Sequence, residues 1–104
     1  MTYYDKLVRD KIPQILEEKN KNFVAFKAAD GDYFRYLKRK LIEEVDEFLE
    51  SPSLKELADV QEVLNAILKD MDYVQADLRR ERALKIEERG AFDDRWILAE
   101  VRDD

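Results

Sequence analysis

Two long segments in the middle of the chain place apolar residues at the period of an α-helix. In residues 33–50 these positions are Phe34, Leu37, Leu41, Val45 and Phe48. In residues 53–71 they are Leu57, Val60, Leu64, Ile67, Leu68 and Met71. A spacing of three and four residues predicts two amphipathic helices, each burying one face. The break between them predicts a tight turn that makes the helices antiparallel, and it contains Ser51, Pro52 and Ser53.

Further helices are predicted on both sides of this pair. Pro13 is tolerated at the start of a helix, and the polar run 17–22 ends that helix. Asp32 is the expected N-cap of the second helix. A fourth helix is predicted for residues 73–89, with Gly90 as its C-terminal stop.

The composition supports a mainly α chain with few, long elements. Charged residues make up 42% and hydrophobic residues 45% of the 104 positions, and there are only two Gly and two Pro. We expect a single domain over residues 1–104, an antiparallel bundle of about four helices. Residues 23–26 and 96–101 are apolar enough to add a short two-stranded β element. A chain of this length buries only a modest core, so oligomerisation would help it.

The residue types that are missing limit the chemistry. There is no Cys, which excludes disulfides and thiolate metal sites, and no His, which removes the commonest general base. A net charge of −6 argues against a nucleic-acid binder that neutralises phosphates. No apolar run reaches membrane-spanning length and the N-terminus lacks a signal-peptide pattern, so we expect a cytoplasmic protein without membrane contact.

Two acidic pairs carry the most specific chemical signal. Glu44 with Glu47, and Glu56 with Asp59, are each spaced three apart and therefore share a helix face. The predicted turn brings the two pairs face to face. Four converging carboxylates repel one another unless a cation lies between them, and a hard divalent ion with oxygen ligands, Mg²⁺ above all, is the simplest candidate.

Each pair also has an ordinary explanation. Acidic residues at this spacing are common on solvated helices. Ser53 and Glu56 have the spacing of a capping box, and Glu47 can pair with a nearby surface cation. Glu44 is the exception, because it lies at the edge of an apolar stripe, where an unpaired carboxylate is costly.

Basic residues near both ends of the chain are candidate phosphate contacts. They are Lys6, Arg9, Lys11, Lys85 and Arg89. Taken locally, an ordinary basic N-terminal segment and helix salt bridges from Lys85 and Arg89 to Glu81 and Glu88 are the favoured explanations. Glu62 and Asn65 continue the Asp59 face and either support the acidic site or form polar helix surface. Several aromatics can stack on a base, although core packing is the commoner role at helical spacing: Tyr33, Phe34, Tyr36 and Trp96.

Together these motifs resemble a known superfamily. E-E-V-D-E at 43–47 followed by E-L-A-D-V at 56–60 is similar to the E-E-x-x-E … E-x-x-D signature of the all-α nucleoside triphosphate pyrophosphohydrolases, the MazG-like and phosphoribosyl-ATP pyrophosphohydrolase-like proteins. K-L-V-R-D-K-I-P at 6–13 and R-G-A-F at 89–92 resemble its small house-cleaning branch. The interval between Glu47 and Glu56 is shorter than in many MazG-like proteins, which leaves base specificity open.

The resemblance implies an enzyme that hydrolyses a nucleoside triphosphate to the monophosphate and pyrophosphate. It implies Mg²⁺, with Mn²⁺ as a substitute, and a homodimer or a dimer of dimers. Carried over by position, the metal ligands are Glu44, Glu47, Glu56 and Asp59. Glu43 matches the first motif position, and with no His available either Glu43 or Glu47 takes the proton from water.

A different class of function stays open. The chain can also be a helical interaction module that keeps the bundle and an acidic metal site but has no catalytic activity. Magnesium-dependent release of pyrophosphate from a panel of nucleotides separates the two readings.

Overall fold

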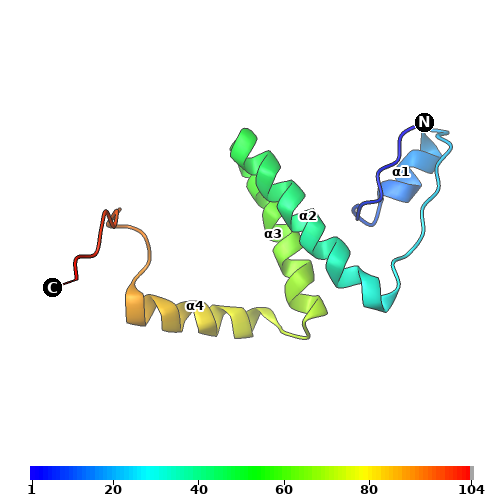
Figure 1. The fold of residues 1–104 in the computed structure, drawn as a ribbon. Coiled ribbons are helices and arrows are strands. Elements are labelled where there is room, and N and C mark those ends of the chain that lie inside the picture. Colours follow the sequence, from blue (N-terminus) through cyan, green and yellow to red (C-terminus); the bar gives the residue numbers. More distant parts are fainter. Residues whose placement is uncertain (104) are drawn as a thin grey trace. The chain divides into compact units, whose positions relative to one another are not determined.

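The computed structural model describes residues 1–103, and all of its regular secondary structure is helical. The helices are α1 (Ile12–Glu18), α2 (Asp30–Glu50), α3 (Leu54–Asp70) and α4 (Gln75–Arg89) (Figure 1). The expected all-α class with four helices is confirmed. No strand forms within residues 1–103, and the segments 23–26 and 96–101 are irregular. An isolated pair of short strands is only marginally stable in water, which accounts for its absence.

The chain divides into two compact units, Met1–Asp72 and Tyr73–Asp104. The first contains α1, α2 and α3. The second contains α4 and the C-terminal segment. The acidic pairs both belong to the first unit.

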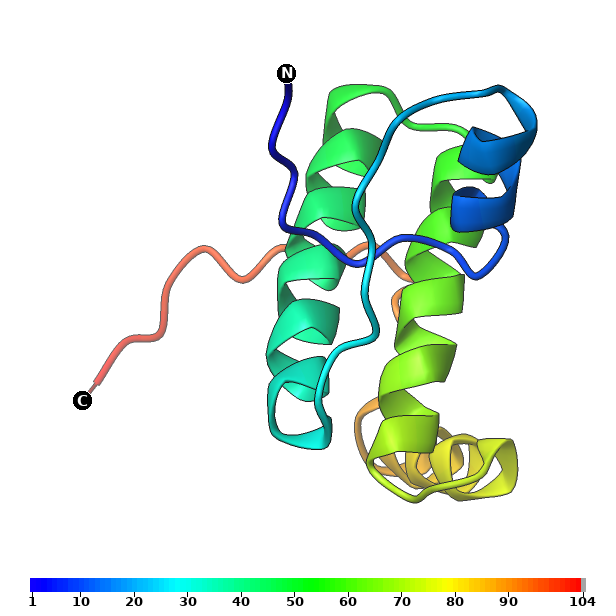
Figure 2. The same cartoon turned by 90° about the vertical axis from the view of Figure 1, so that its right-hand side faces the viewer.

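The centre of the first unit is an antiparallel hairpin of α2 and α3 (Figure 2). Ser53 caps α3, because its Oγ accepts a hydrogen bond of 3.1 Å from the backbone N–H of Glu56. α2 begins earlier than expected, with Ala29 at the N-cap position and without a side-chain cap. Asp30 and Asp32 lie in its first turn instead, where their charge favours the helix dipole.

Very few side chains of the hairpin are buried. Leu37 is fully buried and Val63 is 8% exposed. The third buried residue is Glu44, 7% exposed, on the same face of α2 as Leu37. An acidic residue therefore takes a core position beside the hairpin's two buried apolar side chains, which is unusual and points to a specific role.

The N-terminal segment, residues 1–11, runs across the hairpin before α1 (Figure 2). Residues 1–9 have no regular secondary structure, so side-chain contacts hold the segment. The hydroxyl of Tyr36 donates a hydrogen bond of 2.6 Å to Asp5, and Arg39 lies 3.8 Å from the same carboxylate. Further ion pairs from this segment reach the acidic residues.

The second unit is a single, highly charged helix with irregular flanks. The carboxylate of Asp77 accepts a hydrogen bond of 2.9 Å from the N–H of Val74 at the start of α4. Gly90 ends α4 with a φ of 80°, a value that glycine adopts without strain, as expected from the sequence. Within residues 1–103 no helix is long and apolar enough to cross a membrane.

Candidate metal centre

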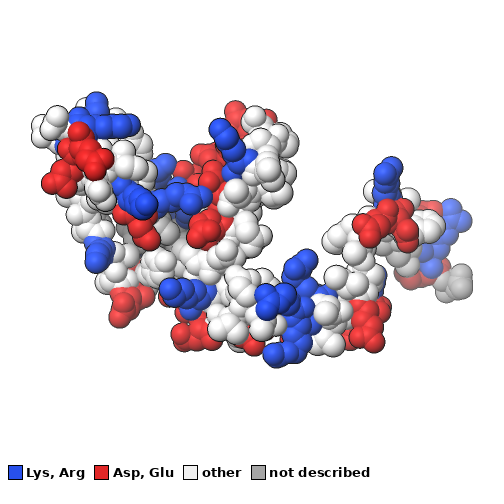
Figure 3. Space-filling view, turned by 180° about the vertical axis from the view of Figure 1, so that it is seen from behind, with Lys and Arg blue, Asp and Glu red and all other residues white. Residues whose placement is uncertain are grey.

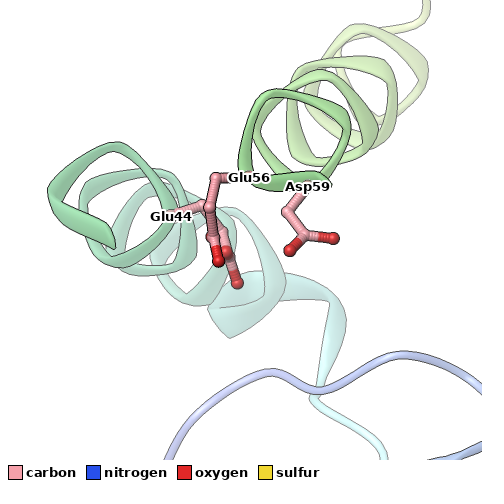
Figure 4. A group of neighbouring side chains, drawn as sticks. All are labelled: Glu44, Glu56 and Asp59. Atoms are coloured by element: carbon pink, nitrogen blue, oxygen red, sulfur yellow. The ribbon is translucent and has the colours of Figure 1, made fainter. Parts of the chain in front are cut away.

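Three carboxylates from two helices meet on one side of the hairpin. Glu44 comes from α2, and Glu56 and Asp59 come from successive positions on one face of α3 (Figure 4). One carboxylate oxygen from each lies within 4.8 Å of the others. The short turn between the helices brings these three side chains together, whereas Glu47, the fourth residue predicted to converge here, is not part of the group.

Two oxygens in this cluster are buried without a protein partner. They are Oε2 of Glu44 and Oε2 of Glu56, for which the described residues provide no hydrogen bond. Burying a carboxylate oxygen without a partner is costly. The two atoms are thus free to accept a cation or a donor that the protein itself does not supply.

The capping-box explanation for Glu56 holds only in part. Ser53 does accept a hydrogen bond from the Glu56 N–H. The Glu56 side chain lies with Glu44 and Asp59 instead of returning to the Ser53 backbone. Only the serine half of the box forms, and the glutamate carboxylate contributes to the acidic cluster.

The two candidate general bases have different surroundings. Glu47 is exposed, outside the group of three. Its pKa is raised, first because its carboxyl shares a hydrogen bond with that of Glu44, and then by the charges of the acidic neighbours. For Glu43, burial alone raises the pKa, but hydrogen bonding to Lys6 and the charge of Lys40 outweigh burial and lower it. Glu43 is thus occupied by Lys6 and Lys40, whereas Glu47 faces solvent.

Two basic side chains of the N-terminal segment form ion pairs with acidic residues of the site. Lys6 Nζ donates to Oε1 of Glu43 at 2.8 Å. Arg9 Nη2 donates to Oδ1 of Asp59 at 2.6 Å. The structure thus places two of the five candidate phosphate-binding residues, Lys6 and Arg9, beside acidic residues of the site. Each lies far in the sequence from the carboxylate that it contacts.

A third cation, Lys40, was not predicted. Its ammonium group lies 3.1 Å from Glu44 and 3.5 Å from Glu43, and its side chain is only 14% exposed. The signal was present in the sequence, since Lys40 precedes these residues by four and three positions, the spacing of helix ion pairs.

The remaining candidates lie elsewhere. Lys11 and Glu62 line a cleft next to the cluster. Asn65 accepts a hydrogen bond of 2.9 Å from Gln61, along α3. Lys85 and Arg89 lie on α4 in the second unit, and their role as phosphate contacts stays a prediction.

The charges of the site do not balance. Five carboxylates converge on this side of the hairpin, from Glu43, Glu44, Glu47, Glu56 and Asp59. Three cations face them, from Lys6, Arg9 and Lys40. The excess negative charge favours binding of a further cation. On the face shown in Figure 3, acidic and basic side chains are interspersed over the first unit, without the one-sign patch that a nucleic-acid backbone would favour.

Comparison with known proteins adds no relative: no family model matches the chain, and neither does any curated protein or solved structure. The membership in the pyrophosphohydrolase superfamily therefore stays a prediction from the sequence motifs.

Replacing Arg9 by Gln is expected to raise the affinity of the site for Mg²⁺ and to lower its affinity for pyrophosphate. Without the Arg9 charge at Asp59, the affinity for Mg²⁺ alone should rise by about two- to fivefold, because the lost ion pair is an exposed one. The affinity for pyrophosphate in the presence of Mg²⁺ should fall by a similar factor. Isothermal titration of each ligand measures both.

Arg35→Gln is the matched control, since Arg35 pairs with Asp32 away from the cluster. It should leave both affinities unchanged. Equal weakening of metal and pyrophosphate binding by Arg9→Gln would instead mean that Arg9 only maintains the fold of the segment.

Proposed function

We propose that this protein is a magnesium-dependent enzyme that hydrolyses a nucleoside triphosphate to the monophosphate and pyrophosphate. The observation that carries the proposal is the convergence of Glu44, Glu56 and Asp59, with two buried carboxylate oxygens that have no protein partner. The sequence motifs that resemble the pyrophosphohydrolase signature add the reaction type.

The donor set fits Mg²⁺. All of the donors are carboxylate oxygens, which hard divalent cations prefer, and neither thiolate nor imidazole is available in the chain. Glu44, Glu56 and Asp59 would hold the ion, while Glu47, predicted as a fourth ligand, lies outside this group and would remain free to accept a proton. When bound, Mg²⁺ stabilises the negative charge of phosphoryl oxygens and lowers the pKa of a coordinated water.

The basic residues around the site would bind the phosphate chain. Arg9 and Lys6 are on an irregular segment and can exchange their carboxylate partners for phosphate oxygens. Lys40 is more buried and stays paired with Glu44, which orients that carboxylate. Phosphoryl transfer depends mainly on such positioning and charge stabilisation.

We assign the role of general base to Glu47. It is exposed to solvent and lies next to the converging carboxylates, where it can accept a proton from a water bound at the site. Glu43 is bound to Lys6 and Lys40, and its lowered pKa makes it a weak acceptor. Glu43 would instead hold the two lysines in position.

A panel assay of standard and modified nucleoside triphosphates tests the proposal. Pyrophosphate release should require Mg²⁺ or Mn²⁺ and should stop on addition of EDTA. The observation that would contradict the proposal is the absence of turnover across the whole panel, or orthophosphate and nucleoside diphosphate as the products.

The position of attack is a separate expectation. If the basic residues hold the β- and γ-phosphates as one leaving group, water attacks the α-phosphorus. Hydrolysis in water enriched in heavy oxygen should then place the label in the nucleoside monophosphate, as measured by mass spectrometry. Label recovered in pyrophosphate would mean attack at the β-phosphorus and a different arrangement of the phosphate chain.

A non-catalytic role is the second candidate, and one observation favours it. Lys6, Arg9 and Lys40 neutralise part of the acidic cluster from within the protein itself. A helical interaction module with a structural metal site would show the same ion pairs. In that case divalent metal should raise the unfolding temperature, while no nucleotide is hydrolysed.

A further inference from the structure

A cleft of about 480 Å³ opens directly beside the acidic cluster, and metal binding does not account for it. Glu44 and Asp59 are among the residues that line it. Its walls come from the N-terminal segment, α1, α2 and α3, all in the first unit. The volume is within the range of pockets that bind small organic ligands.

Most of the cleft wall between these elements is apolar. The contributing side chains include Leu7, Val8, Ile12, Leu37 and Val63. Leu37 and Val63 are the two buried apolar residues of the hairpin, and both line the cleft. An apolar surface of this kind suits a flat ring system. A polyphosphate would bind instead at the acidic cluster, where the neighbouring cations attract it.

The length of the cleft matches a nucleoside attached to a phosphate at the acidic cluster. Tyr33 lines the cleft eleven residues before Glu44 on α2, a separation of about 16 Å along the helix axis. Ala66 lines it seven residues after Asp59 on α3, about 10 Å along that axis. A phosphate at Glu44 and Asp59 therefore leaves room for the sugar and base toward Tyr33.

The end near Tyr33 is rich in hydrogen-bond acceptors. A second hollow of about 510 Å³ shares Asp10, Tyr33 and Glu62 with the first and adds Asp70. Burial raises the pKa of Tyr33, and the charges of Asp70 and Asp10 raise it further, so both carboxylates lie near its hydroxyl. Lys69 is the one basic residue that lines this hollow.

We propose that this cleft binds the nucleobase of the substrate and that Asp10 and Glu62 select a base whose edge carries adjacent N–H donors, as guanine does. The inference rests on the proposed function and adds the substrate class to it. A carboxylate can accept from the N1–H and the 2-amino group of guanine at the same time. Adenine, uracil and thymine each present an acceptor where guanine presents a donor, and that acceptor would face a carboxylate.

Nucleoside monophosphates test the proposal without hydrolysis. In isothermal titrations with Mg²⁺ present, GMP should bind more tightly than AMP or UMP by about tenfold or more, the discrimination typical of a paired carboxylate contact. IMP, which has the N1–H but lacks the 2-amino group, should lie between GMP and AMP.

Two conservative variants locate the selectivity. Asp10→Asn and Glu62→Gln should each reduce the preference for GMP over AMP by several fold, while the affinity for Mg²⁺ alone stays unchanged. Glu17→Gln is the matched control, because Glu17 is an exposed residue of α1 that does not line the cleft. It should keep the full preference.

The outcomes separate this inference from the proposed function. Selective binding of GMP with no triphosphate hydrolysed would overturn the enzymatic proposal and leave the cleft as a guanine nucleotide site. Turnover of all triphosphates alike, with equal binding of the monophosphates, would overturn the inference and leave the enzyme. Binding of none of the monophosphates, or a GMP preference that both variants retain, also overturns the inference.

Discussion

Replacing Glu44 by Gln and Asp59 by Asn in one variant should abolish binding of Mg²⁺ and reduce pyrophosphate release by at least about a hundredfold. The two residues come from different helices and supply two of the three converging carboxylates. Their loss leaves Glu56 as the only member of the group, and a single carboxylate does not hold a divalent ion tightly. Isothermal titration measures the first effect, and the nucleotide assay measures the second.

Glu56→Gln is the control that separates loss of metal from loss of fold. Within residues 1–103 Glu56 forms no ion pair, so this change removes one charge of the cluster without leaving a cation unpaired. In EDTA its unfolding temperature should equal or exceed that of the parent, because like charges packed together are destabilising. If the double variant binds Mg²⁺ as well as the parent does, the metal site lies elsewhere.

Self-association is the second large effect that we expect. At 100° per residue, Ile42 and Leu49 lie on the side of α2 away from Glu43 and Glu47, and they are 62% and 68% exposed. On α3, Leu57 is 50% exposed. A symmetric dimer that covers these exposed apolar side chains with a second copy of the chain would bury surface that the first unit alone leaves in water.

Sedimentation equilibrium at micromolar concentration should show a dimer or a larger assembly of dimers. The variant Ile42→Glu with Leu49→Glu should sediment as a monomer. Val24→Glu is the control, since Val24 is 95% exposed in an irregular segment outside α2 and α3. A monomeric parent protein with full activity would rule out assembly as a requirement for function.

The hairpin and its acidic cluster could be predicted because both depend on local spacing. Apolar residues at helical period predicted α2 and α3, and the three-residue break fixed their antiparallel order. Once that order is known, Glu44 must face Glu56 and Asp59. The sequence also indicated that Glu44 lies at the edge of an apolar stripe, and the structure shows it as a buried residue.

The contacts of the N-terminal segment could not be predicted in the same way. Lys6 pairs with Glu43 and Arg9 with Asp59 across 37 and 50 residues, from a segment without a repeating pattern. No periodic signal specifies such a partner. The start of α2 was also misjudged, because Asp32 has the side chain of an N-cap but lies within the first turn. The cleft had no sequence signal at all, since it forms only where the segment crosses the hairpin.

The division between hairpin and N-terminal segment affects how such a protein can evolve. The residues that would hold the metal belong to two rigid helices, where a one-residue insertion turns a ligand away by about 100°. Arg9, Lys6 and part of the cleft wall belong to an irregular stretch that tolerates substitution and changes in length. Changes in about ten residues can therefore alter which ligand is accepted while the ion-binding scaffold is inherited intact.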